Sequence, residues 1–183
     1  AGLIKHYEHI AQRVELPMIL YNVPSRTGVS FAAETYQVLS QLPQINGVKE
    51  ASGNLSLLAH TRALCGEDFY IWSGNDDQVV PIMSLGAKGV ISVAANLIPE
   101  VMARMSHLCL EGNFREAQAL QLAYMDLIDA LFLEVNPIPI KAALNLAGYD
   151  VGSLRLPLCD MSSGNLERLR RAMVKAGLLQ KSA

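Results

Sequence analysis

Residues 44–54 read QINGVKEASGN. The apolar residues Ile45 and Val48 predict a short buried strand that ends on Lys49. The small residues after it predict a turn, with Asn54 as the cap of the next helix. A lysine where an apolar strand meets a loop is costly, because desolvation disfavours its charged form and favours the free amine. A free amine in a pocket is a nucleophile for carbonyl carbon, so we predict that Lys49 forms a Schiff base with a keto acid.

The pattern of a strand followed by a helix occurs four times in the first part of the chain. Such alternation with short connections predicts a parallel sheet built from right-handed crossovers. The sequence has neither the glycine motif of dinucleotide-binding folds nor a phosphate-binding loop. We therefore predict an α/β fold in which residues 1–112 form the second half of a TIM (β/α)8 barrel. The expected strands lie near residues 18–23, 45–49, 69–73 and 89–93.

The period of the apolar residues changes from Phe114 onward and becomes that of long amphipathic helices. Prolines near residue 137 interrupt the pattern, and glycines close the helices that follow. Residues 113–183 are therefore predicted to form a C-terminal helical domain packed on the barrel. Ser30 is expected to cap the helix after the first strand. Because the chain begins within a helical pattern, we expect it to be the later part of a longer protein.

The composition excludes several classes of protein. Hydrophobic residues make up 51% and charged residues 17%, which predicts a well-packed globular protein rather than a disordered one. The net charge is -2 and no basic run occurs, so nucleic acids and anionic membranes are not expected partners. No apolar run approaches the roughly 20 residues of a transmembrane helix, and the first residues do not resemble a signal peptide.

The cysteines and histidines give no support for a metal site. Cys65, Cys109 and Cys159 are far apart and odd in number, which predicts reduced, buried thiols in a cytoplasmic protein. His6 and His9 have the spacing of a metal-binding pair, but the sequence offers no third ligand nearby. No metal is therefore expected.

The geometry of a barrel separates Lys49 from the other lysines. Catalytic groups lie where barrel strands end, and Lys49 ends a strand, whereas Lys88 precedes one and belongs at the opposite mouth. If odd-numbered strand residues point inward, Gly47 clears space beside the lysine stem. The predicted inner face then consists of Ile19, Tyr21, Gly47, Lys49, Ile71, Ser73, Ile91 and Val93.

An amine, a phenol and a guanidinium at one mouth supply what keto-acid chemistry needs. Lys49 condenses with the ketone, Tyr21 moves protons, and Arg26 grips a carboxylate with two hydrogen bonds. The sequence also leaves a plainer interpretation open. In it, Lys49 pairs with a carboxylate such as Asp76, Tyr21 is a core residue with a satisfied hydroxyl, and Arg26 is solvated.

Five motifs, in order, resemble the dihydrodipicolinate synthase family of pyruvate-dependent class I aldolases, which also contains N-acetylneuraminate lyase. They are YNVPSRTG at 21–28, GVKEASGN at 47–54, SGNDD at 73–77, GAKGVIS at 86–92 and NPIPIK at 136–141. The resemblance spans nearly the whole chain. It implies a lyase that condenses pyruvate with L-aspartate 4-semialdehyde to 4-hydroxy-tetrahydrodipicolinate, in lysine and diaminopimelate biosynthesis. No cofactor or metal is implied.

The resemblance also implies individual roles. Lys49 forms the Schiff base with pyruvate, and Tyr21 is the proton donor and acceptor that orients it. Arg26 binds the carboxylate of the semialdehyde, whereas the sialic acid lyases of the family carry an apolar residue there. Ile91 contacts bound pyruvate through its backbone.

Further expectations follow from the same resemblance. Gly74 and Asn75 are expected among the substrate-binding residues, and the protein is expected to form a homotetramer as a dimer of dimers. The family's first half-barrel, with a threonine pair for the pyruvate carboxylate, has no counterpart in this sequence. We therefore expect the chain alone to be inactive. Another pyruvate aldolase of the family, such as a sugar-acid lyase, and a non-catalytic half-barrel are the alternatives.

Overall fold

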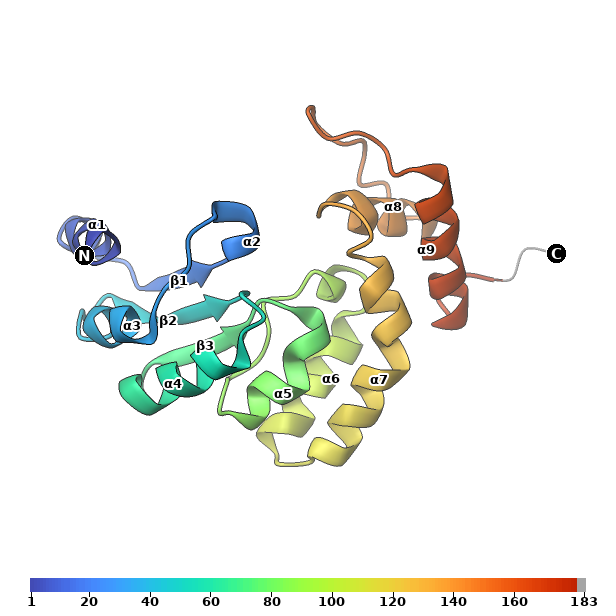
Figure 1. Cartoon of the computed structure of the whole chain (residues 1–183). Helices are drawn as coiled ribbons and strands as arrows, with labels where there is room; N and C mark the ends of the chain where they lie inside the picture. Colours follow the sequence, from blue (N-terminus) through green and yellow to red (C-terminus); the bar gives the residue numbers. More distant parts are fainter. Residues whose placement is uncertain (181–183) are drawn as a thin grey trace.

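The chain alternates strands with helices and ends in a group of helices, as a computed structural model that describes residues 1–180 shows (Figure 1). The strands are β1 (Met18–Asn22), β2 (Ile45–Glu50) and β3 (Tyr70–Ser73). The helices up to β3 are α1 (Gly2–Ala11), α2 (Pro24–Thr27), α3 (Ala33–Leu39) and α4 (Leu55–Cys65). After β3 come the 3-10 turn η1 (Asp76–Gln78), α5 (Val79–Ser84), the 3-10 turn η2 (Ala94–Asn96), α6 (Pro99–Leu110), α7 (Phe114–Ala130), α8 (Ile138–Leu146) and α9 (Ser163–Lys175). Over residues 1–180, no helix combines the length and the apolar character needed to cross a membrane.

The three strands form one parallel sheet in the order β1-β2-β3. The segment predicted as a fourth strand, 89–93, is instead a single bridge between Ser73 and Val90. Pairing with β3 ends at Ile91, whose amide donates to the carbonyl of Ser73, and the amide of Val93 donates to the carboxylate of Asp76 at 3.0 Å. The prediction of a full fourth strand is therefore wrong, although its segment does lie against β3.

One face of the sheet is buried and the other is open. Leu20, Val48 and Ile71 are each 1% exposed and join the core formed with α3, α4 and α5. On the opposite face Tyr21 is 44% exposed and Tyr70 is 41% exposed. The open face corresponds to the inner wall of the predicted barrel.

The prediction of inward-pointing residues is wrong for the third strand. The register pairs Tyr21 with Lys49 and Lys49 with Trp72, so these three side chains share the open face. Ile71 and Ser73, which were expected to point inward, lie on the buried face. The odd-number rule fails because the residues paired between β2 and β3 differ by an odd number of positions.

Gly47 has a different role from the predicted one. A Cβ at Gly47 would lie 2.0 Å from the carbonyl oxygen of Tyr70 and 3.0 Å from the ring of Trp72. Real Cβ atoms do not approach a backbone oxygen so closely. Gly47 therefore permits the close approach of β3 to β2, and it does not clear space for the stem of Lys49.

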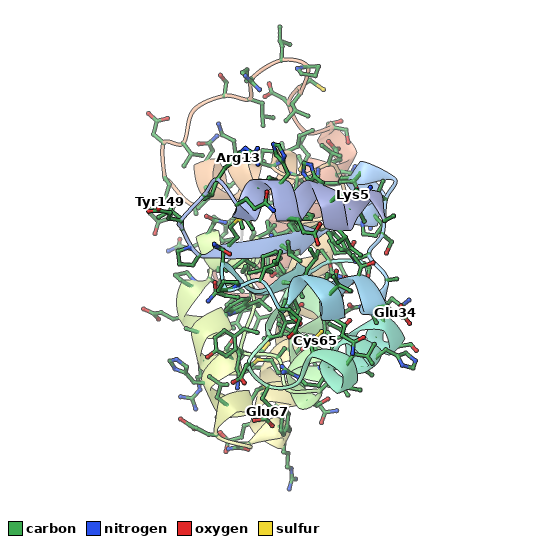
Figure 2. The ribbon with its side chains drawn as sticks, turned by 90° about the vertical axis from the view of Figure 1, so that its left-hand side faces the viewer. Lys5, Arg13, Glu34, Cys65, Glu67 and Tyr149 are labelled. Atoms are coloured by element: carbon green, nitrogen blue, oxygen red, sulfur yellow. The ribbon has the colours of Figure 1, made fainter. Side chains whose placement is uncertain are left out.

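Helices cover the buried face and extend beyond it. Seen from the α1 end, α1, α3 and α4 lie one below the other, and Lys5, Glu34 and Cys65 mark them (Figure 2). Farther along the chain α6 packs on α7, and both α7 and α8 pack on α9. The C-terminal helices α8 and α9 lie at the opposite end of the molecule from α1 (Figure 1).

The predicted helix caps are partly right. The side chain of Asn54 accepts a hydrogen bond from the amide of Leu57 at 2.9 Å, so Asn54 caps α4 as predicted. Ser30 does not cap α3, whose N-cap residue is Ala32. The cap prediction fails because the chain stays extended beyond Ser30 and α3 starts later.

The cysteine prediction is also partly right. All three cysteines are free thiols. Cys109 is buried and Cys65 is half-buried, but Cys159 is exposed in the loop between α8 and α9. The prediction of a buried thiol is wrong for Cys159, because that residue lies outside the helices.

We expect Gly47→Ala to destabilise the protein by about 3 kcal/mol or more, because the new methyl group must displace β3. Urea unfolding followed by circular dichroism measures this change. Gly164→Ala in α9 is the matched control: no atom lies within 4 Å of its Cβ position, so it should be neutral or slightly stabilising. Equal effects of the two substitutions would contradict the close approach at Gly47.

Candidate active site

Lys49 and Tyr21 lie side by side on the open face of the sheet. They are register partners on β2 and β1, one residue before the end of each strand. The Nζ atom of Lys49 stands over the ring of Tyr21, 4.4 Å from the ring centroid. The electron-rich ring face attracts the ammonium and holds the lysine stem across it. Parallel pairing thus brings together the amine and the phenol that the sequence singled out.

The suggested ion pair between Lys49 and Asp76 does not form. Asp76, the suggested partner of Lys49, is 1% exposed, and its Oδ2 accepts the amide hydrogens of Val93 at 3.0 Å and of Ala94 at 2.8 Å. Within residues 1–180 no carboxylate forms an ion pair with Lys49. Tyr21 is 44% exposed on the open face of the sheet.

Asp76 is a structural carboxylate. Burial raises its pKa, and the hydrogen bonds that it accepts oppose this rise. It anchors the start of η2, and so determines where the segment after β3 turns away from the sheet. This contact fixes the backbone at Val93 and Ala94, shortly after Ile91.

Gly74 provides the space beside the lysine. A Cβ at Gly74 would lie 2.5 Å from Cβ of Ala51 and 3.1 Å from Cε of Lys49. The amide of Gly74 donates to the carbonyl of Glu50 at 2.8 Å, which keeps the backbone of the loop close to the end of β2. The space-clearing role that the sequence suggested for Gly47 therefore belongs to Gly74.

Ile91 and Asn75 also lie at the carboxyl end of the sheet. The amide of Ile91 donates to the carbonyl of Ser73 at 2.8 Å, so its own carbonyl is the backbone group left for a ligand. The side-chain Nδ2 of Asn75 donates to Gln78 Oε1 at 3.3 Å, and the backbone amide of Asn75 donates to Ser73 Oγ at 3.1 Å. The loop after β3 is therefore held by its own polar groups.

Arg26 stands apart from the other groups. It lies on the short helix α2, which follows the carboxyl end of β1 (Figure 1). Its side chain is exposed and forms neither a hydrogen bond nor an ion pair with any residue in 1–180. The structure thus places Arg26 at the same end of the sheet without joining it to Lys49.

A cavity of about 560 Å³ opens at this end of the sheet. It is lined by Ser25 from α2, Ala51 and Ser52 from the turn after β2, Asn75 from the loop after β3, and Phe132 beyond α7. A cavity of about 600 Å³ lies elsewhere, between α8 and α9. Within residues 1–180 no three His, Cys, Asp or Glu side chains are grouped as metal ligands.

The sequence analysis missed one buried carboxylate next to the lysine. Glu50 is 3% exposed and points to the face opposite Lys49. Its oxygens accept hydrogen bonds from Asn22 Nδ2 at 3.0 Å, from the hydroxyl of Tyr36 at 3.0 Å and from the amide of Ser52 at 2.8 Å. Burial and the charge of Glu50 raise the pKa of Tyr36, so its hydroxyl keeps its proton. The signal available in the sequence was a glutamate directly after a strand lysine.

Comparison with curated proteins identifies close relatives. The chain is 50% identical over 172 residues to the 4-hydroxy-tetrahydrodipicolinate synthase of Clostridium novyi (strain NT), which covers 94% of this chain and 58% of that protein. It is 50% identical over 182 residues to the enzyme of the same name from Thermoanaerobacter sp. (strain X514), covering 99% of this chain and 61% of that protein. The chain thus spans about three fifths of the length of these relatives.

Solved structures give the same result. The dihydrodipicolinate synthase of Cyanidioschyzon merolae, with lysine bound, superposes with a TM-score of 0.93 at 45% identity over 97% of this chain and 61% of that one. The Thermotoga maritima enzyme gives 0.94 at 39% identity over 97% and 62%. These barrels confirm the predicted second half of a (β/α)8 barrel with C-terminal helices. The model of the dihydrodipicolinate synthetase family matches residues 1–176, and the chain belongs to this family.

Proposed function

We propose that this chain carries the Schiff-base lysine of a 4-hydroxy-tetrahydrodipicolinate synthase. The observation that carries the proposal is the position of Lys49, whose amine lies 4.4 Å from the ring centroid of Tyr21 at the carboxyl end of β2. Barrel enzymes perform their chemistry at this end of the strands. The names of the relatives supply the reaction, because two of them at 50% identity are synthases of this kind.

The proposed reaction proceeds through covalent catalysis by Lys49. Its amine attacks the ketone of pyruvate, and loss of water gives an iminium. Removal of a proton from the methyl group gives an enamine, whose carbon attacks the aldehyde of L-aspartate 4-semialdehyde. The amino group of the product then displaces Lys49 and closes the ring. Tyr21 donates and accepts the protons of these steps, since its hydroxyl is on the same open face.

The remaining site residues are proposed to bind substrate. Arg26 binds the carboxylate of the semialdehyde, because its guanidinium is unpaired among residues 1–180 and presents two parallel donors. The carbonyl of Ile91 contacts pyruvate, and Asn75 lines the cavity next to the turn after β2. Gly74 leaves room for the lysine stem and for the adduct on it.

The chain needs further strands for this chemistry. The sheet exposes Tyr21 and Tyr70 on its inner face, and an open sheet leaves polar edges unpaired. We propose that a preceding half-barrel closes the site, because the chain matches about three fifths of the length of its relatives. A cytoplasmic location is proposed from the widely spaced cysteines of the sequence.

Self-association is also proposed, as a homotetramer built from two dimers. Leu122 on α7 is 65% exposed and lies beside Val80 and Pro81 of α5, where an apolar hollow of about 560 Å³ opens. Exposed apolar surface of this kind is typical of contacts between protein chains. One solved relative is a monomeric dihydrodipicolinate synthase variant.

Borohydride trapping with pyruvate tests the Schiff base. With the preceding half-barrel supplied from a relative, we expect one reduced pyruvate on Lys49, located by peptide mass spectrometry. Lys49→Ala should abolish the adduct and leave circular dichroism unchanged. Lys88→Ala is the matched control, because Lys88 also faces a tyrosine ring, at 6.0 Å, but at the other end of the sheet.

Two results would count against the proposal. Loss of folding in Lys49→Ala, with no adduct in the unsubstituted protein, supports a non-catalytic half-barrel. A stoichiometric adduct on the 183-residue chain alone would show that the additional strands are not needed.

Arg26→Ala tests the identity of the aldehyde. Losing a hydrogen bond to a charged group costs about 1.5–3 kcal/mol, so kcat/KM for the semialdehyde should fall about 10- to 100-fold. Pyruvate trapping on Lys49 should be unaffected. Arg13→Ala, an exposed arginine on the α1 side (Figure 2), serves as the control. Equal loss of pyruvate trapping would mean that Arg26 does not act on the second substrate.

A further inference from the structure

We propose that Glu50, paired with Asn22, is a positioning residue that holds Lys49 and Tyr21 in their reactive arrangement. The inference rests on the proposed function of Lys49. It concerns the face of the sheet opposite the site, where neither residue touches a substrate. The pair is an amide and a carboxylate that join the ends of β1 and β2.

The positions of the four residues follow from one register. Tyr21 pairs with Lys49, and the next row pairs Asn22 with Glu50. Because strand side chains alternate, the first row faces the open side and the second row faces the core. Each member of the buried row is covalently adjacent to one member of the open row. Fixing Asn22 against Glu50 therefore fixes the backbone that carries Tyr21 and Lys49.

The buried pair is fully engaged. Asn22 Nδ2 lies 3.0 Å from both carboxylate oxygens of Glu50, and Asn22 Oδ1 accepts the amide hydrogen of Phe31 at 3.3 Å. Glu50 also accepts from Tyr36 on α3 and from the amide of Ser52. The carboxylate thus links β1, the turn after β2 and the helix layer.

Backbone hydrogen bonds continue the same connection. The amide of Ala51 donates to the carbonyl of Asn22 at 2.9 Å, and the amide of Gly74 donates to the carbonyl of Glu50 at 2.8 Å. The carboxyl ends of all three strands are therefore tied at one level. Lys49 projects from the sheet at this level. A Cβ added at Gly74 would lie 3.1 Å from Cε of Lys49.

A stabilising role alone does not explain a carboxylate at this place. Glu50 is 3% exposed, and no cation pairs with it among residues 1–180. Burying an unpaired charge is costly, and an apolar residue of similar size often gives equal or greater stability. A carboxylate, however, collects several donors in one geometry, and an apolar side chain cannot. The arrangement therefore favours a role in positioning.

Exchanging the two side-chain types tests the pair. Glu50→Gln sets an amide against an amide, Asn22→Asp sets a carboxylate against a carboxylate, and the double variant restores an amide and a carboxylate in reversed order. All three keep the size of the side chains. The readout is the rate constant of borohydride trapping at saturating pyruvate, measured with the half-barrel supplied, together with the pyruvate concentration for half-maximal rate.

We expect each single substitution to slow trapping about 10-fold, because a buried hydrogen bond to a charged group is worth about this factor. The half-maximal pyruvate concentration should not change. The double variant should be faster than the product of the two single effects, because it restores an amide–carboxylate contact between positions 22 and 50, while Tyr36 and Ser52 still face an amide in place of the carboxylate. Glu134→Gln is the matched control. Glu134 also accepts from an asparagine, Asn165 at 2.8 Å, but this half-buried pair lies in the C-terminal region.

Each outcome is decisive. Single variants within about 2-fold of the unsubstituted rate constant would overturn the inference, as would a double variant as slow as the product of the two single effects. A purely structural role predicts a smaller amount of adduct with an unchanged rate constant, and that result would overturn it too. If the unsubstituted protein forms no adduct, the proposed function fails and the inference fails with it. If the adduct forms normally but the exchange has no effect, only the inference fails.

Discussion

The parallel pairing of β1 with β2 fixes the amine and the phenol of the proposed site. Its register places Tyr21 opposite Lys49 on the open face and Asn22 opposite Glu50 in the core. Because side chains alternate, a slip of one residue would bury Lys49 and expose Glu50. The four hydrogen bonds that hold Glu50 would be lost in that slip. The carboxylate in the core and the amine at the site therefore specify the same register.

Much of this arrangement could be predicted from the sequence. Three strands lie where the apolar runs predicted them, and Asn54 caps the helix after Lys49. Lys49 could be selected because it was expected to end its strand, where barrel enzymes act, and Tyr21 because it was expected on the same inner face. These predictions depend on local pattern and on the alternation of strands and helices. Both are properties of short segments, and the sequence contains them directly.

Other features depend on contacts between segments and could not be predicted. Paired residues of β2 and β3 differ by an odd number of positions, so even-numbered residues of β3 share a face with odd-numbered residues of β2. Trp72, and not Ile71, is therefore the register partner of Lys49. A Cβ at Gly47 would meet the backbone of Tyr70, whereas a Cβ at Gly74 would meet the stem of the lysine. The role of each glycine is decided by the segment that packs beside it.

The open face also explains what the chain contributes to the proposed reaction. Tyr21 is 44% exposed, and Lys49 is half-buried, so water has access to the amine and the phenol. Proton transfer and carbonyl addition are more effective where water is excluded. Glu50, in contrast, is already buried, and closing the barrel would leave its surroundings unchanged. The register that pairs Lys49 with Tyr21 is therefore complete in this chain, while the open face leaves both side chains accessible to water.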